Sequence, residues 1–511
     1  MSLNNAPSKK NTRWRLLLIA ELLVLVSWLV LGNLPNFVEQ GWDGAIDLLF
    51  LILAIGVALV WVIFLSRLVW SQRLIGIGLI LLPSILVKID GHTGSFFPQL
   101  SWRWSKESAT EMPELTGEMA KEGVAIETAG PAYFPRLLGE NMNNWVTGEL
   151  LPDGWEGKEP EELWRIEMGE GWSAFTVAGQ FAFTMEQRGS AETTICYELK
   201  TGNAVWSHAD EIRFEESMGG NGPRSTPTVA NGKVYVLGAT GILNCLDART
   251  GDLVWGKDIL KEVGQTVPKW AKSCSPLVAD GKVIITLGSE AKKNLAAFTM
   301  ETGELLWRSG DYPSSYASPV VATLADKRQV VAILQKAVAG FEIETGKELW
   351  SFPIDNPQSN CASPLIVGDT VITSSGYGYG THRIKIEHSE SGFEAKELWH
   401  SLKLKAKFAD MVVKDGYLYG LNDGRMTCLN LEDGKSAWRG GNYGHGQILG
   451  VGEHMIVQSE QGDISVLELN SEGEEIVSEF DALDHRTWNH PALAGRILLV
   501  RNDREAIAFK Y

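Results

Sequence analysis

A repeated sequence unit constrains the fold of this chain more than any other feature. In each copy, an alternating strand ends at a two-residue turn such as Thr-Gly or Asp-Gly, and the following strand closes on tryptophan. Glycine supplies the positive φ that such hairpins need. The tryptophans lie 39 to 52 residues apart, which is the length of one four-stranded propeller blade. Clear copies occupy residues 196–206, 245–255, 297–307, 340–350 and 428–438.

The count of repeat units predicts an all-β fold, an eight-bladed β-propeller over residues 161–511. Proline often follows Ser or Thr where an innermost strand begins at the channel, and there its missing N–H does little harm. The last blade has three strands of its own, and we expect Leu163–Met168 to complete it and close the ring. Seven blades is the alternative if the unit ending at Phe480, where tryptophan is expected, is not a true blade. The innermost strands are expected near residues 173, 225, 273, 316, 361, 408, 446 and 488.

The tryptophans of the repeat are predicted to dock their large apolar faces against a neighbouring blade. Five cysteines are present without any Cys-x-x-Cys pair, so the sequence predicts neither a zinc site nor a thioredoxin-type redox site. Cys196, Cys245 and Cys428 occupy equivalent repeat positions and are expected to pack as small hydrophobic residues. The structural role of docking against a neighbouring blade is assigned to the repeat tryptophans Trp164, Trp206, Trp255, Trp307, Trp350, Trp399 and Trp438.

Three apolar runs, 14–34, 46–66 and 74–89, predict three transmembrane helices before the propeller. The N-terminus and the second loop are basic, whereas the first loop is acidic. By the positive-inside rule, residues 1–13 then lie in the cytoplasm and the propeller lies on the periplasmic side of a bacterial inner membrane. A cleaved signal peptide in the first run is an alternative, although an A-x-A cleavage pattern is missing. If the third run is only interfacial, the propeller would be cytoplasmic.

Residues 90–160 are polar, with scattered proline and glycine, and are predicted to form a linker and cap. The chain has 46 Lys and Arg against 63 Asp and Glu, a net charge of -17. This balance argues against binding nucleic acid, because neutralising phosphates requires a basic face.

The motif x-L-D-x-x-T-G-x-x-x-W, repeated over residues 161–511, resembles the repeat of pyrroloquinoline-quinone (PQQ) dehydrogenases and of the assembly lipoprotein BamB. The segments GWSAF (171–175), EQRG (186–189) and MGGNGPRSTPTV (218–229) are more closely similar to PQQ-binding-like propeller repeat proteins, which are common in planctomycete-type bacteria. The resemblance implies a quinoprotein-type propeller. The membrane-bound glucose dehydrogenase family also places several helices before such a propeller.

Chemistry with PQQ needs Ca²⁺ held by oxygen ligands, with an Asp base beside it. Several members of the dehydrogenase family also use a pair of adjacent cysteines. This sequence has no Cys-Cys pair, and it shows none of the family's Asp and Asn ligands in a recognisable context. We therefore predict no catalytic residues, no metal ligands and no cofactor; PQQ with calcium is the cofactor that the resemblance would imply.

Five residues stand outside the blade pattern, most of them just before an innermost strand. The starts of these strands line one mouth of the channel. Arginine, lysine and tryptophan together there would form a cationic and aromatic cluster for an anionic or planar ligand. In the alternative, the cations cap loop carbonyls and the indoles plug the channel. The candidates are Arg188, Arg224, Trp270, Lys272 and Trp488.

Two functions from different classes follow. The first is a membrane-tethered periplasmic propeller that binds protein partners or a ligand, as the resemblance to BamB implies. The second is a PQQ-dependent membrane dehydrogenase that oxidises alcohols or sugars and passes electrons to quinone.

Overall fold

The computed structural model of the chain divides into two compact units, Met1–Lys106 and Glu107–Tyr511, and each is described by itself. The N-terminal tail, the acidic first loop and parts of the predicted linker lie outside the described residues. The structure describes residues 11–31, 43–66, 68–116, 126, 133–146, 160–290, 292–354, 356 and 359–511.

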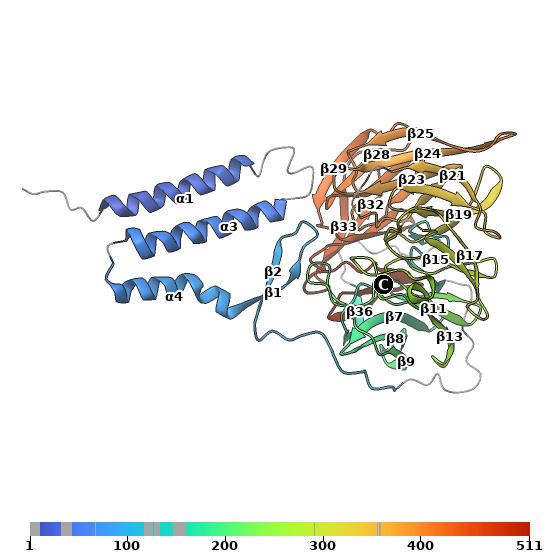
Figure 1. Ribbon diagram of the computed structural model, residues 1–511, viewed down its shortest axis with the longest axis horizontal. Helices are drawn as coiled ribbons and strands as arrows, with labels where there is room; N and C mark the ends of the chain where they lie inside the picture. The colour runs from blue at the N-terminus through green and yellow to red at the C-terminus, as the bar shows by residue number, and fades with distance from the viewer. Residues whose placement is uncertain are drawn as a thin grey trace, which may run out of the picture. The chain divides into compact units, whose positions relative to one another are not determined.

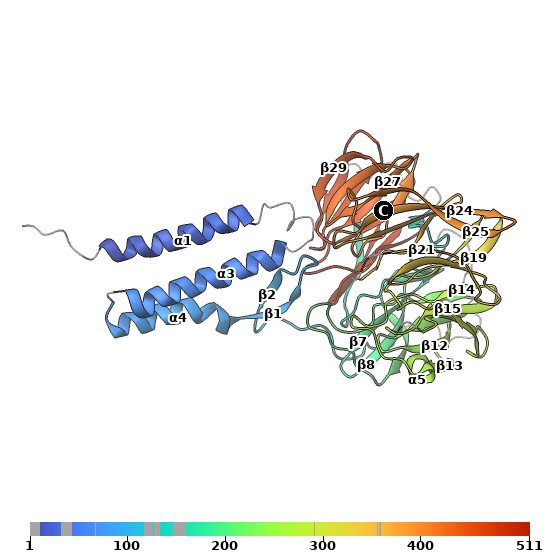
Figure 2. The same cartoon turned by 45° about the horizontal axis from the view of Figure 1, so that its top comes forward.

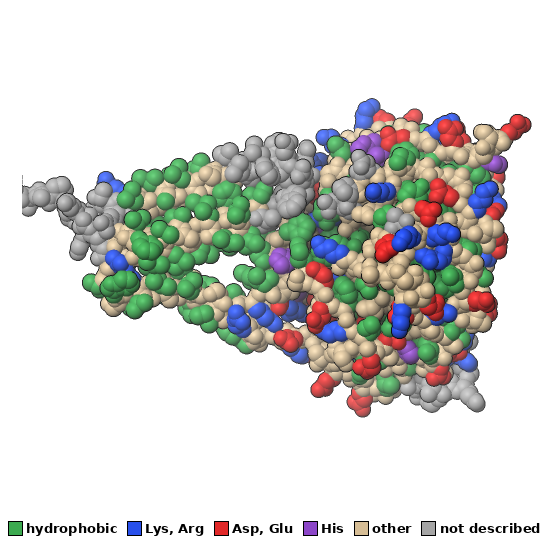
Figure 3. Space-filling view, in the orientation of Figure 1, with side chains coloured by type: hydrophobic (Ala, Val, Ile, Leu, Met, Phe, Trp, Pro, Cys, Tyr) green, Lys and Arg blue, Asp and Glu red, His purple; other side chains and the backbone are tan. Residues whose placement is uncertain are grey.

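The first unit consists of apolar helices followed by a short hairpin. The surface of the helices carries mainly large hydrophobic side chains (Figure 3). In chain order, the elements are α1 (Asn11–Leu31), α3 (Asp43–Val60) with its π-helical extension η1 (Trp61–Leu65), α4 (Trp70–Leu86), β1 (Val87–His92) and β2 (Pro98–Trp102).

Among the described helices, one is long and apolar enough to cross a membrane. It is Ile46–Leu65, with 20 residues and a mean hydropathy of 3.2. Helix α4 is apolar but has only 17 residues. Of the three predicted transmembrane helices, length and composition thus support the second. The third also differs from the predicted range 74–89, because Val87 leaves the helix and pairs with Trp102 in the β1–β2 hairpin.

The second unit is an eight-bladed β-propeller, as predicted (Figures 1 and 2). Seven blades have four consecutive strands that pair in chain order, and the eighth takes its outer strand from the start of the domain. The unit that ends at Phe480 forms a complete sheet, so the seven-bladed alternative is wrong. A short helix, α5 (Ile259–Val263), follows the second blade.

The first four blades contain β6 (Thr176–Ala178), β7 (Phe181–Arg188), β8 (Ala191–Glu198) and β9 (Ala204–Asp210); β10 (Thr228–Ala230), β11 (Lys233–Leu237), β12 (Ile242–Asp247) and β13 (Leu253–Asp258); β14 (Leu277–Ala279), β15 (Lys282–Thr286), β16 (Leu295–Thr299) and β17 (Leu305–Ser309); β18 (Val320–Leu324), β19 (Lys327–Ile333), β20 (Ala337–Phe341) and β21 (Glu348–Pro353).

The last four blades contain β22 (Leu365–Val367), β23 (Thr370–Ser375), β24 (Gly380–Ser389) and β25 (Gly392–Ser401); β26 (Val412–Lys414), β27 (Tyr417–Asn422), β28 (Arg425–Asn430) and β29 (Ser436–Asn442); β30 (Gln447–Val451), β31 (His454–Gln458), β32 (Ile464–Glu468) and β33 (Glu475–Phe480); β34 (Ala492–Ala494), β35 (Ile497–Arg501), β36 (Glu505–Lys510) and β5 (Glu161–Glu167).

The tryptophan and the turn glycine of the repeat meet between neighbouring blades. Each indole N–H donates to a carbonyl in the next blade, and the distance from Trp255 Nε1 to the Met300 oxygen is 2.9 Å. The turn glycine of that next blade packs on the same indole, because a Cβ on Gly303 would stand 2.6 Å from the Trp255 ring. At this position the indole therefore packs against the neighbouring blade. The same donation to the next blade occurs at Trp164, Trp206, Trp307, Trp399 and Trp438.

Two repeat units depart from this arrangement. In blade four, the Trp350 indole donates to Gln329 of its own blade, because the following hairpin β24–β25 is longer than the others and projects from the ring (Figure 2). In blade seven, Ser478 pairs with Val466 just before the bulge, where the other blades have tryptophan. The prediction that Phe480 replaces tryptophan is therefore wrong by two residues. Phe480 packs against Phe509 of blade eight instead.

The Ser/Thr-Pro pairs hold neighbouring blades together at the channel. The backbone N–H of Ala174 donates to Thr226 Oγ1, that of Thr226 to Ser275 Oγ, and that of Ser275 to Ser318 Oγ, at 2.9–3.1 Å. The Ser363 N–H donates in the same way to Asp410, at 2.6 Å. Because these residues bond sideways, the ladders of the first strands begin one to four residues later than predicted.

A segment from the predicted linker lies in the channel. Strand β3 (Tyr133–Phe134) pairs with the end of β6, and β4 (Trp145–Val146) pairs in parallel with the end of β30. Between them, the Pro135 carbonyl accepts from the N–H of Val229 in a third blade. Residues 133–146 therefore fill the end of the channel where the innermost strands finish. The end where those strands begin forms the mouth considered next.

Candidate ligand-binding mouth of the propeller channel

One residue from each blade stands at the mouth, two positions before the residue that bonds to the next blade. Four of these eight side chains are aromatic. The rings of Trp172 and Trp488 lie 5.0 Å apart, and those of Phe408 and Trp488 lie 5.1 Å apart. Phe408 and Trp488 belong to blades six and eight, so side chains from non-adjacent blades meet here. The full set is Trp172, Arg224, Ser273, Tyr316, Cys361, Phe408, His445 and Trp488.

Arg224, Trp270 and Trp488 of the five predicted residues lie at this mouth. The Arg224 guanidinium donates to the carbonyls of Gly220 and Gly222 at 2.8 and 3.0 Å. Burial lowers the pKa of Arg224 to about 10, so it stays cationic at neutral pH. Trp270 lies beside it, because a Cβ on Gly219 would be within 3.3 Å of both side chains.

Arg188 and Lys272, the other two predicted members of the ligand cluster, are buried and bonded to other parts of the protein. Arg188 is buried and forms an ion pair with Glu186 at 3.1 Å. Lys272 is 1% exposed and donates to Thr286 Oγ1 at 3.1 Å and to the Leu287 carbonyl at 2.5 Å. Burial also lowers the pKa of Lys272. Both residues match the alternative in which cations satisfy loop and strand oxygens.

Arg486 is a mouth residue that the sequence reasoning missed. Its guanidinium carbon lies over the rings of Trp172 and Trp488, 4.7 and 4.4 Å from their centroids. The same arginine donates to the Met218 carbonyl at 3.3 Å. The only signal for it was positional, since Arg486 comes two residues before the mouth residue Trp488. Lys407 is similar and stacks on Tyr377 and Phe408.

The acidic groups of the mouth are occupied by the protein itself. Glu460 accepts from Trp488 Nε1 at 2.8 Å and from the His445 N–H at 3.1 Å. Burial raises the pKa of the Asp410 carboxyl to about 7, although the Ser363 N–H bond opposes this shift. Burial, together with the nearby Lys407, lowers the pKa of His445 to about 3, so this imidazole is neutral. The cations of the mouth are Arg224, Lys407 and Arg486; Lys407 and Arg486 are 2% and 3% exposed, so their charges act from within the mouth.

Comparison with known proteins matches this repeat to one family. Residues 190–440 match the family of the outer membrane protein assembly factor BamB. BamB of Shewanella oneidensis is 25% identical over 161 residues, which is 31% of this chain and 39% of that protein. The propeller is BamB-like. A quinone alcohol dehydrogenase subunit of Gluconacetobacter polyoxogenes is 32% identical over 136 residues, which is 25% of this chain and 18% of that protein.

Solved structures share the fold of this BamB-like propeller. BamB from Moraxella catarrhalis aligns with a TM-score of 0.51 at 15% identity, over 69% of this chain and 98% of its own. The quinohemoprotein alcohol dehydrogenase of Comamonas testosteroni aligns with a TM-score of 0.55 at 13% identity, over 74% and 80%. The chain spans less than two-fifths of the length of the curated relatives it matches.

The residues of the channel mouth do not fit PQQ with calcium. Calcium takes six to eight oxygen ligands. The described residues contain no cluster of three or more His, Cys, Asp or Glu side chains that could hold a metal ion. Glu460 and Asp410, the acids nearest the rings, each accept hydrogen bonds from protein N–H groups. The two indole faces that could support a flat cofactor are covered by Arg486.

Proposed function

We propose that this chain is a binding platform held in a bacterial inner membrane, with its propeller on the periplasmic side and the channel mouth as its contact surface. The observation that carries the proposal is the composition of the mouth. Three cations, Arg224, Lys407 and Arg486, stand among large aromatic rings, whereas the protein as a whole has a net charge of -17. Such a surface favours an acidic partner segment that also carries flat side chains.

The membrane part of the proposal rests on the N-terminal helices. Ile46–Leu65 has the length and hydropathy of a transmembrane helix. We propose that α1 and α4 cross as well, with the N-terminus in the cytoplasm, because Lys9 and Lys10 precede α1 and Arg67 precedes α4 in the sequence. Three crossings would leave the propeller outside the inner membrane. The relation to BamB supports a role in docking protein partners.

Site-specific photo-crosslinking in native membranes tests both parts. A photoreactive amino acid at Ser273, a small mouth residue, should capture a partner. The same group at Asp326, an exposed turn residue at the opposite ends of the innermost strands, is the matched control and should not. The captured proteins are identified by mass spectrometry. Equal labelling from both positions would contradict the mouth as the contact surface, and capture of cytoplasmic proteins alone would contradict the periplasmic location.

A PQQ-dependent membrane dehydrogenase is the second candidate function, and the 32% identity to a quinone alcohol dehydrogenase subunit favours it. The purified protein incubated with PQQ and Ca²⁺ separates the two candidates. The binding platform should show neither a bound quinone absorbance band nor dye-linked oxidation of alcohols or sugars. If both signals are observed, the binding-platform proposal is contradicted and the PQQ-dependent dehydrogenase is supported.

A further inference from the structure

A pocket of about 380 Å³ lies apart from the ring of mouth residues, between blades four and five. Blade four supplies Phe352 from the end of its outer strand β21. Blade five supplies Tyr379 from the loop after β23, His382 from β24 and His400 from the end of β25. This is the place where the tryptophan-to-glycine contact between neighbouring blades is missing, because Trp350 bonds within its own blade.

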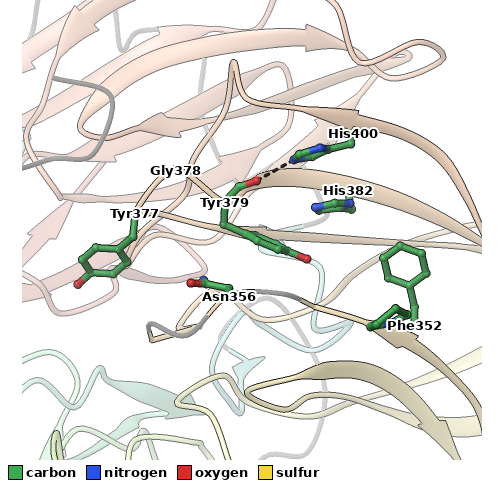
Figure 4. A pocket seen from close by; sticks show the side chains of 8 residues that line it. Phe352, Asn356, Tyr377, Gly378, Tyr379, His382 and His400 are labelled. Atoms are coloured by element: carbon green, nitrogen blue, oxygen red, sulfur yellow. Dashed lines mark hydrogen bonds between the residues drawn. The ribbon is translucent and has the colours of Figure 1, made fainter. Parts of the chain in front are cut away.

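Four rings form the walls of this pocket. His382 and His400 stack in parallel, with centroids 3.9 Å apart and an angle of 9°. Tyr379 lies 4.7 Å from His382, and Phe352 lies 5.9 Å from it. Figure 4 shows the Tyr379 ring pointing toward His382 and Phe352, while Tyr377 points the other way. The walls therefore offer flat apolar faces around one side chain, His382.

The two imidazoles have defined tautomers. His382 Nδ1 lies 2.6 Å from a Glu397 carboxylate oxygen, and an ionised carboxylate only accepts, so Nδ1 carries the proton. His400 Nε2 donates to the Tyr379 carbonyl at 2.7 Å (Figure 4). Burial lowers the pKa of His382, and the neighbouring His400 adds to this effect, although the bond to Glu397 opposes it. His382 is thus neutral, and its Nε2 is a hydrogen-bond acceptor.

That acceptor has no hydrogen-bond partner among the residues that the structure describes. His382 is 9% exposed, and its Nε2 is a buried atom without a hydrogen bond. Buried polar atoms are nearly always satisfied, and an exception needs an explanation. No described residue that lines the pocket carries a fixed charge. A ligand that completes this site is therefore neutral, has a flat face for the rings and has an O–H to donate to Nε2.

We propose that this pocket binds a small neutral ring compound with a hydroxyl group at its edge, donated to His382 Nε2. A pyranose sugar and a phenol share this chemistry, since both present a flat C–H or aromatic face next to a hydroxyl. None of the eight mouth residues lines this pocket, although Tyr377, on which Lys407 of the mouth stacks, does. The proposal does not depend on the function proposed for the mouth.

Binding to the full chain in detergent is the first test, with methyl glucoside and phenol as separate probes at millimolar concentration. Saturation-transfer NMR and calorimetry should detect at least one of them, and the responding probe identifies the ligand source. His382→Phe keeps a ring in the stack but removes the acceptor, so binding should weaken at least tenfold. His388→Phe is the matched control on the same strand, where His388 stacks on Phe393 outside the pocket, and it should bind like the unaltered protein.

A second measurement needs no variant. Nitrogen-15 NMR of the imidazole side chains follows Nε2 directly. The bound probe should shift the His382 Nε2 resonance and leave the resonances of His388 unchanged. The proposal is overturned if neither probe shifts the His382 resonance, or if His382→Phe, folded by its circular dichroism, binds as well as the unaltered protein.

Discussion

At the scale of single residues, the tryptophan of one repeat copy contacts the glycine of the next copy, not the glycine of its own. Trp255 belongs to blade two, while the glycine beneath its indole, Gly303, belongs to blade three. The same division applies to the hydroxyl that bonds sideways at the channel, since Ser275 serves Thr226 of the preceding blade. Each residue type is thus required by a neighbouring copy of the repeat.

Asp410 is the acidic member of this sideways set, and its environment gives a testable pH dependence. Its folded-state pKa is raised to about 7, whereas an unfolded aspartate has a pKa of about 3.9. Between these values the folded protein binds more protons than the unfolded chain. The contribution of Asp410 to the free energy of unfolding therefore falls as the pH rises from about 4 to about 7, and it is constant above that range.

We expect Asp410→Asn to remove this dependence, because its amide oxygen still accepts from the Ser363 N–H and does not titrate. Relative to the unaltered protein, the variant should become more stable as the pH rises from about 4 to about 7. Urea unfolding at a series of pH values measures the difference. A difference that is independent of pH would show that the Asp410 carboxyl titrates near its unfolded pKa.

At the scale of elements, the outer hairpin of each blade is shaped by the blade before it. The turn between β16 and β17 needs glycine for two reasons, since Gly303 has a φ of +66° and has no room for a Cβ beside Trp255. The longer hairpin β24–β25 does not place a turn glycine on the indole of the preceding blade. The pocket around His382 is lined by residues of this hairpin.

We expect Gly303→Ala to cost about 1–3 kcal/mol, since its Cβ would overlap the Trp255 indole in addition to straining φ. Gly281→Ala is the matched control in the same sheet, because Gly281 has a φ of +73° and nothing within 4 Å of its Cβ position. Chemical denaturation of both variants separates overlap from backbone strain. Equal losses of stability would mean that the indole does not restrict the turn.

At the scale of the whole molecule, the ring depends on a strand that comes from the start of the domain. Strand β5 pairs with β36, and the Trp164 indole donates to the Leu199 carbonyl of blade one at 2.9 Å. The fully buried Arg501 of β35 adds bonds from blade eight to Thr184 and Met185 of blade one. These contacts remove the two exposed sheet edges that an open ring would leave.

We expect replacement of Glu161–Glu167 by a glycine-serine segment of equal length to open this closure. The loss should exceed that of Trp164→Ala, for which truncation of a buried large aromatic residue predicts about 3–5 kcal/mol. Scanning calorimetry should show a lower Tm and a broader transition. If the replacement behaves like the single variant, β5 contributes through Trp164 only.

The propeller, the number of blades, the closing strand and the docking tryptophans could all be predicted from the sequence. The period of a repeat is visible in the sequence, and hairpin turns and alternating strands are encoded by neighbouring residues. The burial of Cys196, Cys245 and Cys428 could also be predicted. The register in blade seven could not, because the bulge that sets Ser478 opposite Val466 depends on strand pairing.

The sites were decided by the tertiary structure. Arg188 and Lys272 were predicted as members of a ligand cluster, but inside the protein they bond to Glu186 and to the end of β15. The channel segment 133–146 and the stacked histidines have no sequence period, since their contacts join residues far apart in the chain. The sequence by itself determined the fold through local, repeated contacts. The mouth, the channel end filled by residues 133–146 and the His382 pocket form where single residues from different parts of the chain come into contact. Such contacts leave no local sequence pattern.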